Sequence, residues 1–255
     1  MLNHPLVVFA LALVLLWISA QAGAYVRRRR GAPDEDGQRD LSVVLGASLT
    51  LLGLVIGFSF SMAVSRYDQR KNLEEEEANA IGTEYLRASL LPAAQAKTVR
   101  SRLATYLAHR ISFYTITDEQ RLAQINTENA VLQAELWSAV QAAAALQPTP
   151  ITALSVSGLN DVFNSQGYTQ AAWLNRIPAP AWSLLAVIAV FCNFLFGYAA
   201  RHAERRYKLL LVLPLIVAIS FFLISDLDSP RGGVIHVLPQ NLMTLSRSIS
   251  GDGTL

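Results

Sequence analysis

Four long runs of this sequence carry no charged residue, and they restrict its fold more than any other feature. They cover residues 1–26, 41–65, 177–200 and 209–225, so all 21 basic and 19 acidic residues of the 255-residue chain lie elsewhere. A bilayer core about 30 Å thick is crossed by roughly 20 apolar residues in a helix. The runs therefore predict an all-α integral membrane protein with four transmembrane helices, over residues 6–22, 41–64, 181–200 and 209–225.

Two apolar stretches have a second interpretation. The small residues at 20–24 would suit a signal-peptide cleavage site, but the arginines follow the first run, whereas a signal peptide carries its positive charge before it. Residues 136–160 are also free of charge, yet Pro148 and Pro150 interrupt them, so their apolar part is too short to cross a bilayer. We therefore expect the first run to be a span and residues 136–160 not to be one.

The runs divide the chain into four parts. Residues 1–65 hold the first two spans with a basic loop at 27–40, residues 66–176 form a helical soluble domain, residues 177–225 hold the other two spans with a basic loop at 201–208, and residues 226–255 form a tail. The two short loops are richer in Lys and Arg than the opposite flanks, which predicts that both are cytoplasmic. The termini and the middle domain would then be extracytoplasmic.

The soluble domain is expected to be helical throughout. No proline occurs between Leu41 and Leu91, so the second span can continue into water as one helix that Pro92 ends. Further helices are expected over 93–114, from a capping box that begins at Thr117 through 146, and over 151–175, with Gly158 and Gly167 weakening the last. In the fourth span, Pro214 is expected to introduce a kink.

No catalytic or metal site is predicted. None of the four histidines pairs with a second ligand at helical metal-binding spacing, and Cys192 stands alone inside an apolar run. The net charge of +2 gives no reason to expect nucleic-acid binding. We expect no enzyme activity, cofactor or metal, and the lipid bilayer as the main partner.

The second span carries a stripe of small residues at helical spacing. Its members are Gly46, Thr50, Gly53, Gly57 and Ser61, with Phe60 on the same face. Small residues allow close helix packing. The same stripe, repeated around an oligomer axis, could instead line a pore with Phe60 as a hydrophobic gate. Sequence periodicity leaves both interpretations open.

Two charged motifs flank the spans. The first contains Arg66, Arg70, Glu74 and Glu77, which could form a solvated face with i,i+4 ion pairs or, in a ring of subunits, a charged vestibule. The second contains Asp226, Asp228 and Arg231 after the fourth span, which could bind a cation, form carboxylate–arginine pairs or make a turn. Pairing or a turn is favoured, because two carboxylates are too few for a specific calcium site.

Three stretches resemble the bestrophin-like family of bacterial membrane proteins. They are Ile56-Gly-Phe-Ser-Phe-Ser-Met-Ala-Val-Ser-Arg66-Tyr-Asp-Gln-Arg70, then Glu77-Ala-Asn-Ala-Ile-Gly with Tyr85-Leu-Arg87-Ala-Ser-Leu-Leu-Pro92, and Asp226-Leu-Asp228-Ser-Pro230-Arg231-Gly232. Together with the four-span layout, the resemblance covers about residues 41–245.

The resemblance implies a bacterial inner (plasma) membrane protein related to bestrophins, which are pentameric chloride channels with a pore lined by the second span. It thus implies a homo-oligomer that passes small ions, with Gly53, Gly57, Phe60 and Ser61 in the pore wall. Two features depart from the bestrophin pattern: the acidic calcium clasp after the fourth span is absent, and the charge bias places the middle domain on the opposite side of the membrane. The alternative function is a non-conducting membrane protein whose helical domain binds or senses a partner.

Overall fold

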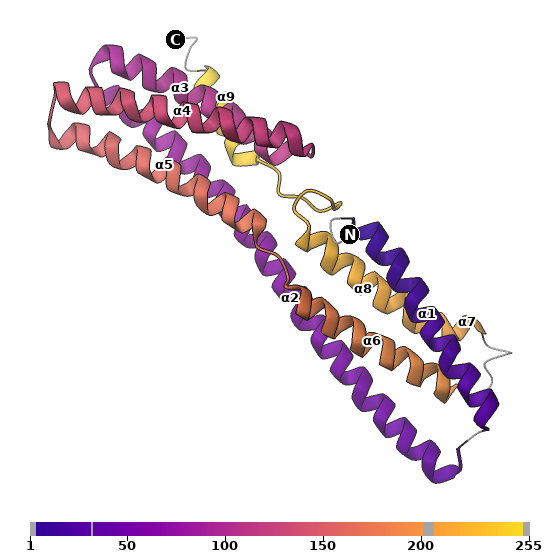
Figure 1. Ribbon diagram of the computed structural model, residues 1–255. Coiled ribbons are helices and arrows are strands. Elements are labelled where there is room, and N and C mark those ends of the chain that lie inside the picture. The colour runs from indigo at the N-terminus through magenta and orange to yellow at the C-terminus, as the bar shows by residue number, and fades with distance from the viewer. Residues whose placement is uncertain (1–3, 32, 201–206, 252–255) are drawn as a thin grey trace. The chain divides into compact units, whose positions relative to one another are not determined.

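The computed structural model describes residues 4–31, 33–200 and 207–251 and divides into two compact units (Figure 1). The first unit comprises Met1–Tyr67 and Arg176–His236, and the second comprises Asp68–Asn175 and Val237–Leu255. All regular secondary structure in the described residues is helical, which confirms the all-α part of the predicted fold class. The predicted tail at 226–255 is divided between the two units after His236.

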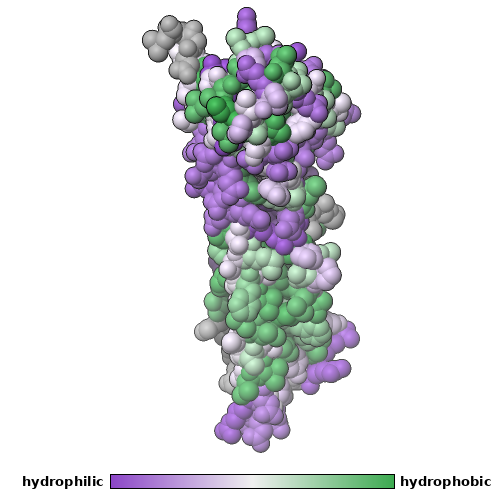
Figure 2. Space-filling model, turned by 90° about the vertical axis from the view of Figure 1, so that its left-hand side faces the viewer, coloured by the Kyte–Doolittle hydropathy of each residue, from purple (hydrophilic) through white to green (hydrophobic). Residues whose placement is uncertain are grey.

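The first unit is built from apolar helices. They are α1 (Pro5–Arg30), the first part of α2 (Glu35–Arg87), α6 (Ala179–Ala199), α7 (Tyr207–Leu210) and α8 (Val212–Asp228). Four helical stretches are long and apolar enough to cross a membrane: Pro5–Arg30, Glu35–Leu90, Pro150–Ala199 and Lys208–Asp228. On the face that Figure 2 displays, hydrophobic side chains dominate the surface of this unit, as expected of a part surrounded by lipid.

The helices of the first unit share one apolar core. Leu16 of α1, Leu52 of α2, Leu185 of α6, and Val217 and Phe221 of α8 belong to one buried cluster. Each of the four long helices thus contributes to the core, so the spans form a bundle within a single subunit.

Helices α1 and α6 cross in backbone contact. A Cβ added to Gly197 of α6 would overlap the backbone of Ala20 and lie 2.7 Å from its carbonyl carbon, and one added to Gly23 of α1 would overlap the carbonyl of Phe194. Such an approach is open only to residues without a side chain at the crossing. These two glycines therefore set the distance between α1 and α6.

The fourth span is interrupted near its start, in the turn that precedes Pro214. Helix α7 ends at Leu210 and α8 begins at Val212, so Pro214 lies in the first turn of α8. A proline has no N–H to donate to the carbonyl four residues back, and its ring clashes with that carbonyl, which here belongs to Leu210. The interruption is therefore in the turn where Pro214 is expected to disturb the helix. The break falls at Leu211. The basic loop predicted at 201–208 lies mostly outside the described residues.

The second unit consists of amphipathic helices. It contains the second part of α2, the short 3₁₀ helix η1 (Ala88–Leu90), α3 (Ala93–Thr115), α4 (Glu119–Leu146), α5 (Pro150–Leu174) and α9 (Gln240–Gly251). Its core includes Ile81, Leu103, Leu107, Leu136 and Leu159, all at most 1% exposed and drawn from α2, α3, α4 and α5.

One local prediction for this unit needs correction. Helix α4 is capped by Asp118, whose side chain accepts the N–H of Arg121 at 2.7 Å, and not by Thr117. The helix expected over 151–175 is present as α5 and includes both Gly158 and Gly167. A Cβ at Gly158 would collide with side chains of α2, which gives a packing reason for a glycine at that position.

Candidate functional site

The small-residue stripe of α2 faces away from the core of the first unit. On the same helix Leu52, Ser59 and Ala63 are at most 8% exposed and mark the packed side. At 3.6 residues per turn the stripe lies about 130° around the helix from that side. All of its predicted members are exposed or half-buried at the surface: Gly46, Thr50, Gly53, Gly57, Phe60 and Ser61.

The glycines of this stripe differ from the packing glycines of α1 and α6. A Cβ added to Gly46, Gly53 or Gly57 would meet no atom within 4 Å. The hydroxyl of Thr50 donates to the carbonyl of Gly46 at 2.9 Å, so its hydrogen-bonding capacity is met within the helix. The stripe is therefore smooth, narrow and uncovered in the single subunit.

Helix α2 is the least covered of the four apolar helices. Within the subunit only 6% of its apolar window is buried, against 44% for α8. Phe58 is 65% exposed and Phe60 is 41% exposed. Phe60 adjoins the stripe, whereas Phe58, two residues away, lies about 160° around the helix from Phe60. The uncovered surface thus has a small-residue side that includes Phe60 and a bulky apolar side that includes Phe58.

Asp228 ties the end of α8 to two other segments of the first unit. Its carboxylate accepts the backbone N–H of Ile177 at 3.0 Å and lies 3.6 Å from the guanidinium of Arg66 on α2. The side chains of this ion pair are 15% exposed for Arg66 and 5% for Asp228. The pair links α2, the segment before α6 and α8 at one place.

Asp226 organises the loop that follows α8. Its two carboxylate oxygens accept the backbone N–H groups of Val234 and Ile235 at 2.7 and 2.9 Å. Arg231 lies in the same loop and is half-buried. The motif therefore shapes a turn, and nowhere in the described residues do three His, Cys, Asp or Glu side chains gather as a metal site would require.

The charge block on α2 is divided between an inward and an outward face. Arg70, Glu74 and Glu77 lie in the second unit and are at most 1% exposed, whereas Glu75 and Glu76 are exposed. A vestibule charge has to face water. Within this run it is therefore Glu75 and Glu76, and not Glu74 or Glu77, that meet the requirement.

Glu74 holds the C-terminal helix in place. Its Oε1 accepts the backbone N–H of Leu242 at 3.0 Å, and its Oε2 accepts the side-chain amide of Asn241 at 2.6 Å. Both donors belong to the first turn of α9, where the free N–H groups and the helix dipole favour a negative charge. Glu74 thus acts as an N-terminal cap supplied by another helix.

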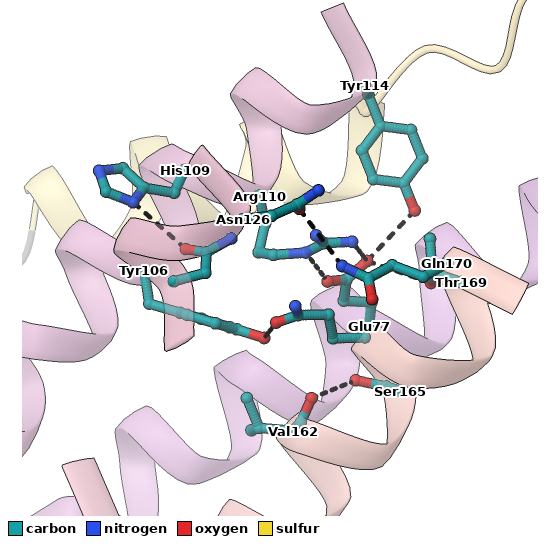
Figure 3. A network of polar contacts seen from close by, with 12 residues as sticks. Glu77, Tyr106, His109, Arg110, Tyr114, Asn126, Val162, Ser165, Thr169 and Gln170 are labelled. Carbon is teal, nitrogen blue, oxygen red and sulfur yellow. Dashed lines mark hydrogen bonds and ion pairs between the residues drawn. The ribbon is translucent and has the colours of Figure 1, made fainter. Parts of the chain in front are cut away.

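Glu77 forms a buried ion pair with Arg110 of α3. Arg110 donates from Nε and Nη2 to the two carboxylate oxygens, at 3.2 Å for Nη2–Oε2, and both side chains are 0% exposed. Tyr114 and Thr169 also donate to Glu77, at 3.2 and 3.3 Å, and Figure 3 shows these groups converging on its carboxylate. This network joins α2, α3 and α5.

The electrostatics of this network keep its arginine and its tyrosines in fixed protonation states. Burial alone would lower the pKa of Arg110, but the charge and hydrogen bonds of Glu77, together with electrostatic interactions with Tyr106 and Tyr114, outweigh burial and hold the pKa above its ordinary value. Burial raises the pKa of Tyr106 and Tyr114, so both stay neutral donors. Tyr106 donates to Gln166 of α5 at the edge of the same network (Figure 3).

Several of these residues are not recognisable from the sequence. Gly23 and Gly197 look like any small residue in an apolar helix, and Arg110 lies on a helix with ordinary amphipathic spacing. The i,i+3 spacing of Glu74 and Glu77 does place them on one face, which is a usable signal. Whether that face is inside depends on partners 168 and 33 residues away.

Fold and geometry together define an α-helical membrane protein with an apolar unit of four long helices and a second helical unit. A family model described as a Bestrophin-like domain matches residues 7–242. The chain belongs to the bestrophin-like family.

Solved structures agree with this assignment. A bacterial bestrophin homologue from Klebsiella pneumoniae, solved by zinc phasing, has a TM-score of 0.65 and 15% identity, covering 96% of this chain and 97% of that one. Two point mutants of a bestrophin homologue from the same organism are similar at 14% identity. One has a TM-score of 0.65 and covers 96% of this chain and 98% of its own, and the other has a TM-score of 0.67 and covers 97% of each. At this identity the likeness concerns the fold. Curated protein sequences show no significant match.

Proposed function

We propose that the protein is a homo-oligomeric, bestrophin-type ion channel in which α2 of every subunit lines the pore. The observation that carries the proposal is the uncovered small-residue face of α2. Glycine-rich faces of membrane helices normally pack against another helix. The subunit leaves this face empty, which supports an oligomer in which a neighbouring subunit or a water-filled path meets it.

Cyclic symmetry turns this face into a ring. Closed oligomers place the same surface of each subunit around one axis, so the stripes would surround a narrow path with one Phe60 from each subunit as an apolar constriction. The bulky side of α2, which includes Phe58, is left for lipid or the adjacent subunit. The resemblance to bestrophins suggests five subunits.

Charges on the water-exposed part of α2 decide the class of ion. The resemblance implies an anion, whereas exposed Glu75 and Glu76 would concentrate cations if they faced the path. Reversal potentials in planar bilayers under asymmetric salt distinguish the two. Replacing both glutamates by glutamine is expected to shift permeability towards anions, and an unchanged reversal potential would place them away from the path.

Single-cysteine scanning tests the pore wall directly. The native Cys192 is 1% exposed and contributes little background to thiol labelling. A charged thiol reagent is expected to block current through G53C and G57C, whereas L51C, exposed on the bulky side of α2 that includes Phe58, serves as the matched control. Equal block at all three positions, or a purified particle that is monomeric, would overturn the proposal.

The side of the membrane is a separate question. Arg28, Arg29 and Arg30 at the end of α1 lie at the surface, and the Lys/Arg bias of the short loops favours a cytoplasmic position for them. We propose on this basis that the bacterial inner membrane holds the second unit on its extracytoplasmic side. Reporter fusions in the α3–α4 loop at residue 117 and in the α1–α2 loop at residue 33 should give opposite signals. A cytoplasmic signal at residue 117 would reverse the orientation.

A further inference from the structure

Glu84 is a buried acid without a hydrogen-bond donor. It lies on α2 in the second unit, is 0% exposed, and neither carboxylate oxygen has a hydrogen-bond partner. An ionised carboxylate in such a place is costly, because no donor replaces the water that it loses. This distinguishes it from Glu74 and Glu77 on the same helix, each of which accepts two or more hydrogen bonds.

The carboxyl of Glu84 packs directly against the backbone of α5. A Cβ added to Gly158 would overlap Glu84 Oε2 and lie 2.6 Å from Nη1 of Arg87. Only glycine leaves room for these two side chains at that point of α5. Glu84 is therefore enclosed where α2 packs against α5.

The nearby charges compensate Glu84 only in part. Arg87, one turn along α2, donates from Nη1 to the carbonyl of Leu154 on α5 at 3.3 Å rather than to Glu84. Asp161 on α5 is exposed and adds a like charge. Arg100 of α3 interacts with Tyr85. Its Nε donates a hydrogen bond to the Tyr85 carbonyl at 3.3 Å, and its guanidinium carbon lies 5.2 Å from the centre of the Tyr85 ring.

The titration of Glu84 follows from this environment. Burial raises its pKa to about 8, Arg87 opposes the shift, and Asp161 adds to it. The folded protein therefore binds this proton more tightly than the unfolded chain does. Near neutral pH the group is mostly protonated, and small changes of pH alter its charge.

We propose that Glu84 is a proton-binding site that makes the contact between α2 and α5 depend on pH. The neutral acid fits against Gly158 and lets Arg87 hold the Leu154 carbonyl. When the proton leaves to solvent, the bare carboxylate attracts the Arg87 guanidinium away from Leu154, and the first turns of α5 loosen from α2. That the proton also gates current rests on the proposed function, in which α2 is the pore helix.

Difference infrared spectroscopy of the purified full-length protein tests the site without any current measurement. Wild type minus E84Q should show a protonated-carboxyl band at pH 6 that disappears between pH 7 and 9. D161N, which removes the neighbouring exposed acid, should keep the band and titrate at lower pH. R87Q should keep the band, and the band should then titrate at higher pH. This shift tests the site even if E84Q fails to fold.

Channel recordings across the same pH range form the second arm. Wild type is expected to change its open probability by several-fold between pH 7 and 9, and E84Q to lose that dependence. Absence of the band in wild type, or a titration that R87Q leaves unmoved, would overturn the proton site. A titrating band in a protein that passes no current would instead leave the proton site standing and refute the channel.

Discussion

Replacing Gly197 by alanine tests whether the two sets of glycines in this protein have different roles. The added Cβ would lie 2.7 Å from the carbonyl carbon of Ala20, about 1 Å inside the favourable contact distance. Because the obstacle is backbone, it cannot rotate away as a side chain would. The Ala20 carbonyl oxygen lies still closer to this Cβ, so helices α1 and α6 would have to separate by at least about 1 Å, which weakens every contact along their crossing.

The expected loss can be bounded from this geometry. A gap of about 1 Å forfeits a quarter to a half of each dispersion contact, and overpacking in cores costs about 1–3 kcal/mol. We take the upper end, about 3 kcal/mol, because backbone meets backbone. Alanine's better helix propensity returns at most about 1 kcal/mol, so G197A should destabilise the subunit by about 2 kcal/mol.

The matched control is G53A on α2. Its Cβ would meet no atom within 4 Å, so the subunit should be as stable as wild type or slightly more so. Tryptophan fluorescence during heating reports both variants, since the chain has four tryptophans. We expect a lower apparent melting temperature for G197A alone, and an effect of G53A on oligomer size or current. Equal destabilisation by the two substitutions would refute the distinction between packing and uncovered glycines.

Four further predictions follow from the described contacts. Phe60→Ala should widen the proposed constriction and raise single-channel current, and unchanged current would remove Phe60 from the pore wall. Glu77→Gln leaves a buried arginine without its counter-charge and should lower the free energy of unfolding, measured by denaturant titration, by about 3–5 kcal/mol. The exposed control Glu76→Gln should change the free energy of unfolding by no more than about 0.5 kcal/mol, and similar values for the two variants would contradict the burial of the Glu77–Arg110 pair. Asp226→Asn should cost about 1–3 kcal/mol and speed proteolysis of the loop it organises, an effect that unchanged cleavage kinetics would disprove. The pKa of Glu84 is raised from 4.5 to about 8 in the folded protein, so the free energy of unfolding should fall by about 1.4 kcal/mol for each pH unit between these two values and should not fall further above pH 8. The difference in stability between wild type and E84Q should therefore vanish near pH 4 and be largest above pH 8.

The sequence was most informative where a single physical requirement acts on a whole segment. Lipid excludes charge and requires internally satisfied backbone, so four charge-free runs predict four apolar helices, and the structure contains them. Proline positions also predicted helix boundaries, because a residue without a backbone N–H fits the first turn of a helix but not its interior. Pro92 follows the end of α2 and η1, and Pro150 begins α5.

Local patterns were less reliable where two adjacent residues could serve equally well, or where the role of a residue depends on the side chain that packs against it. Thr117 and Asp118 are both competent caps, and the choice of Asp118 depends on the path of the loop that precedes α4. Gly158 shows in the sequence only a poor helix former, because nothing in its own segment reveals that Glu84 lies against it. In both cases the deciding partner is a matter of three-dimensional approach.

The sequence by itself determined the local properties of each segment: which helices are apolar enough for lipid, where they start and stop, and which side chains share a face. What only the tertiary structure decided is which of those faces are covered. Gly23 and Gly197 are in backbone contact while Gly53 and Gly57 meet nothing, and Glu77 is enclosed while Glu76 is exposed. The reason is that helical periodicity depends on the chain alone, whereas burial depends on partners far along it.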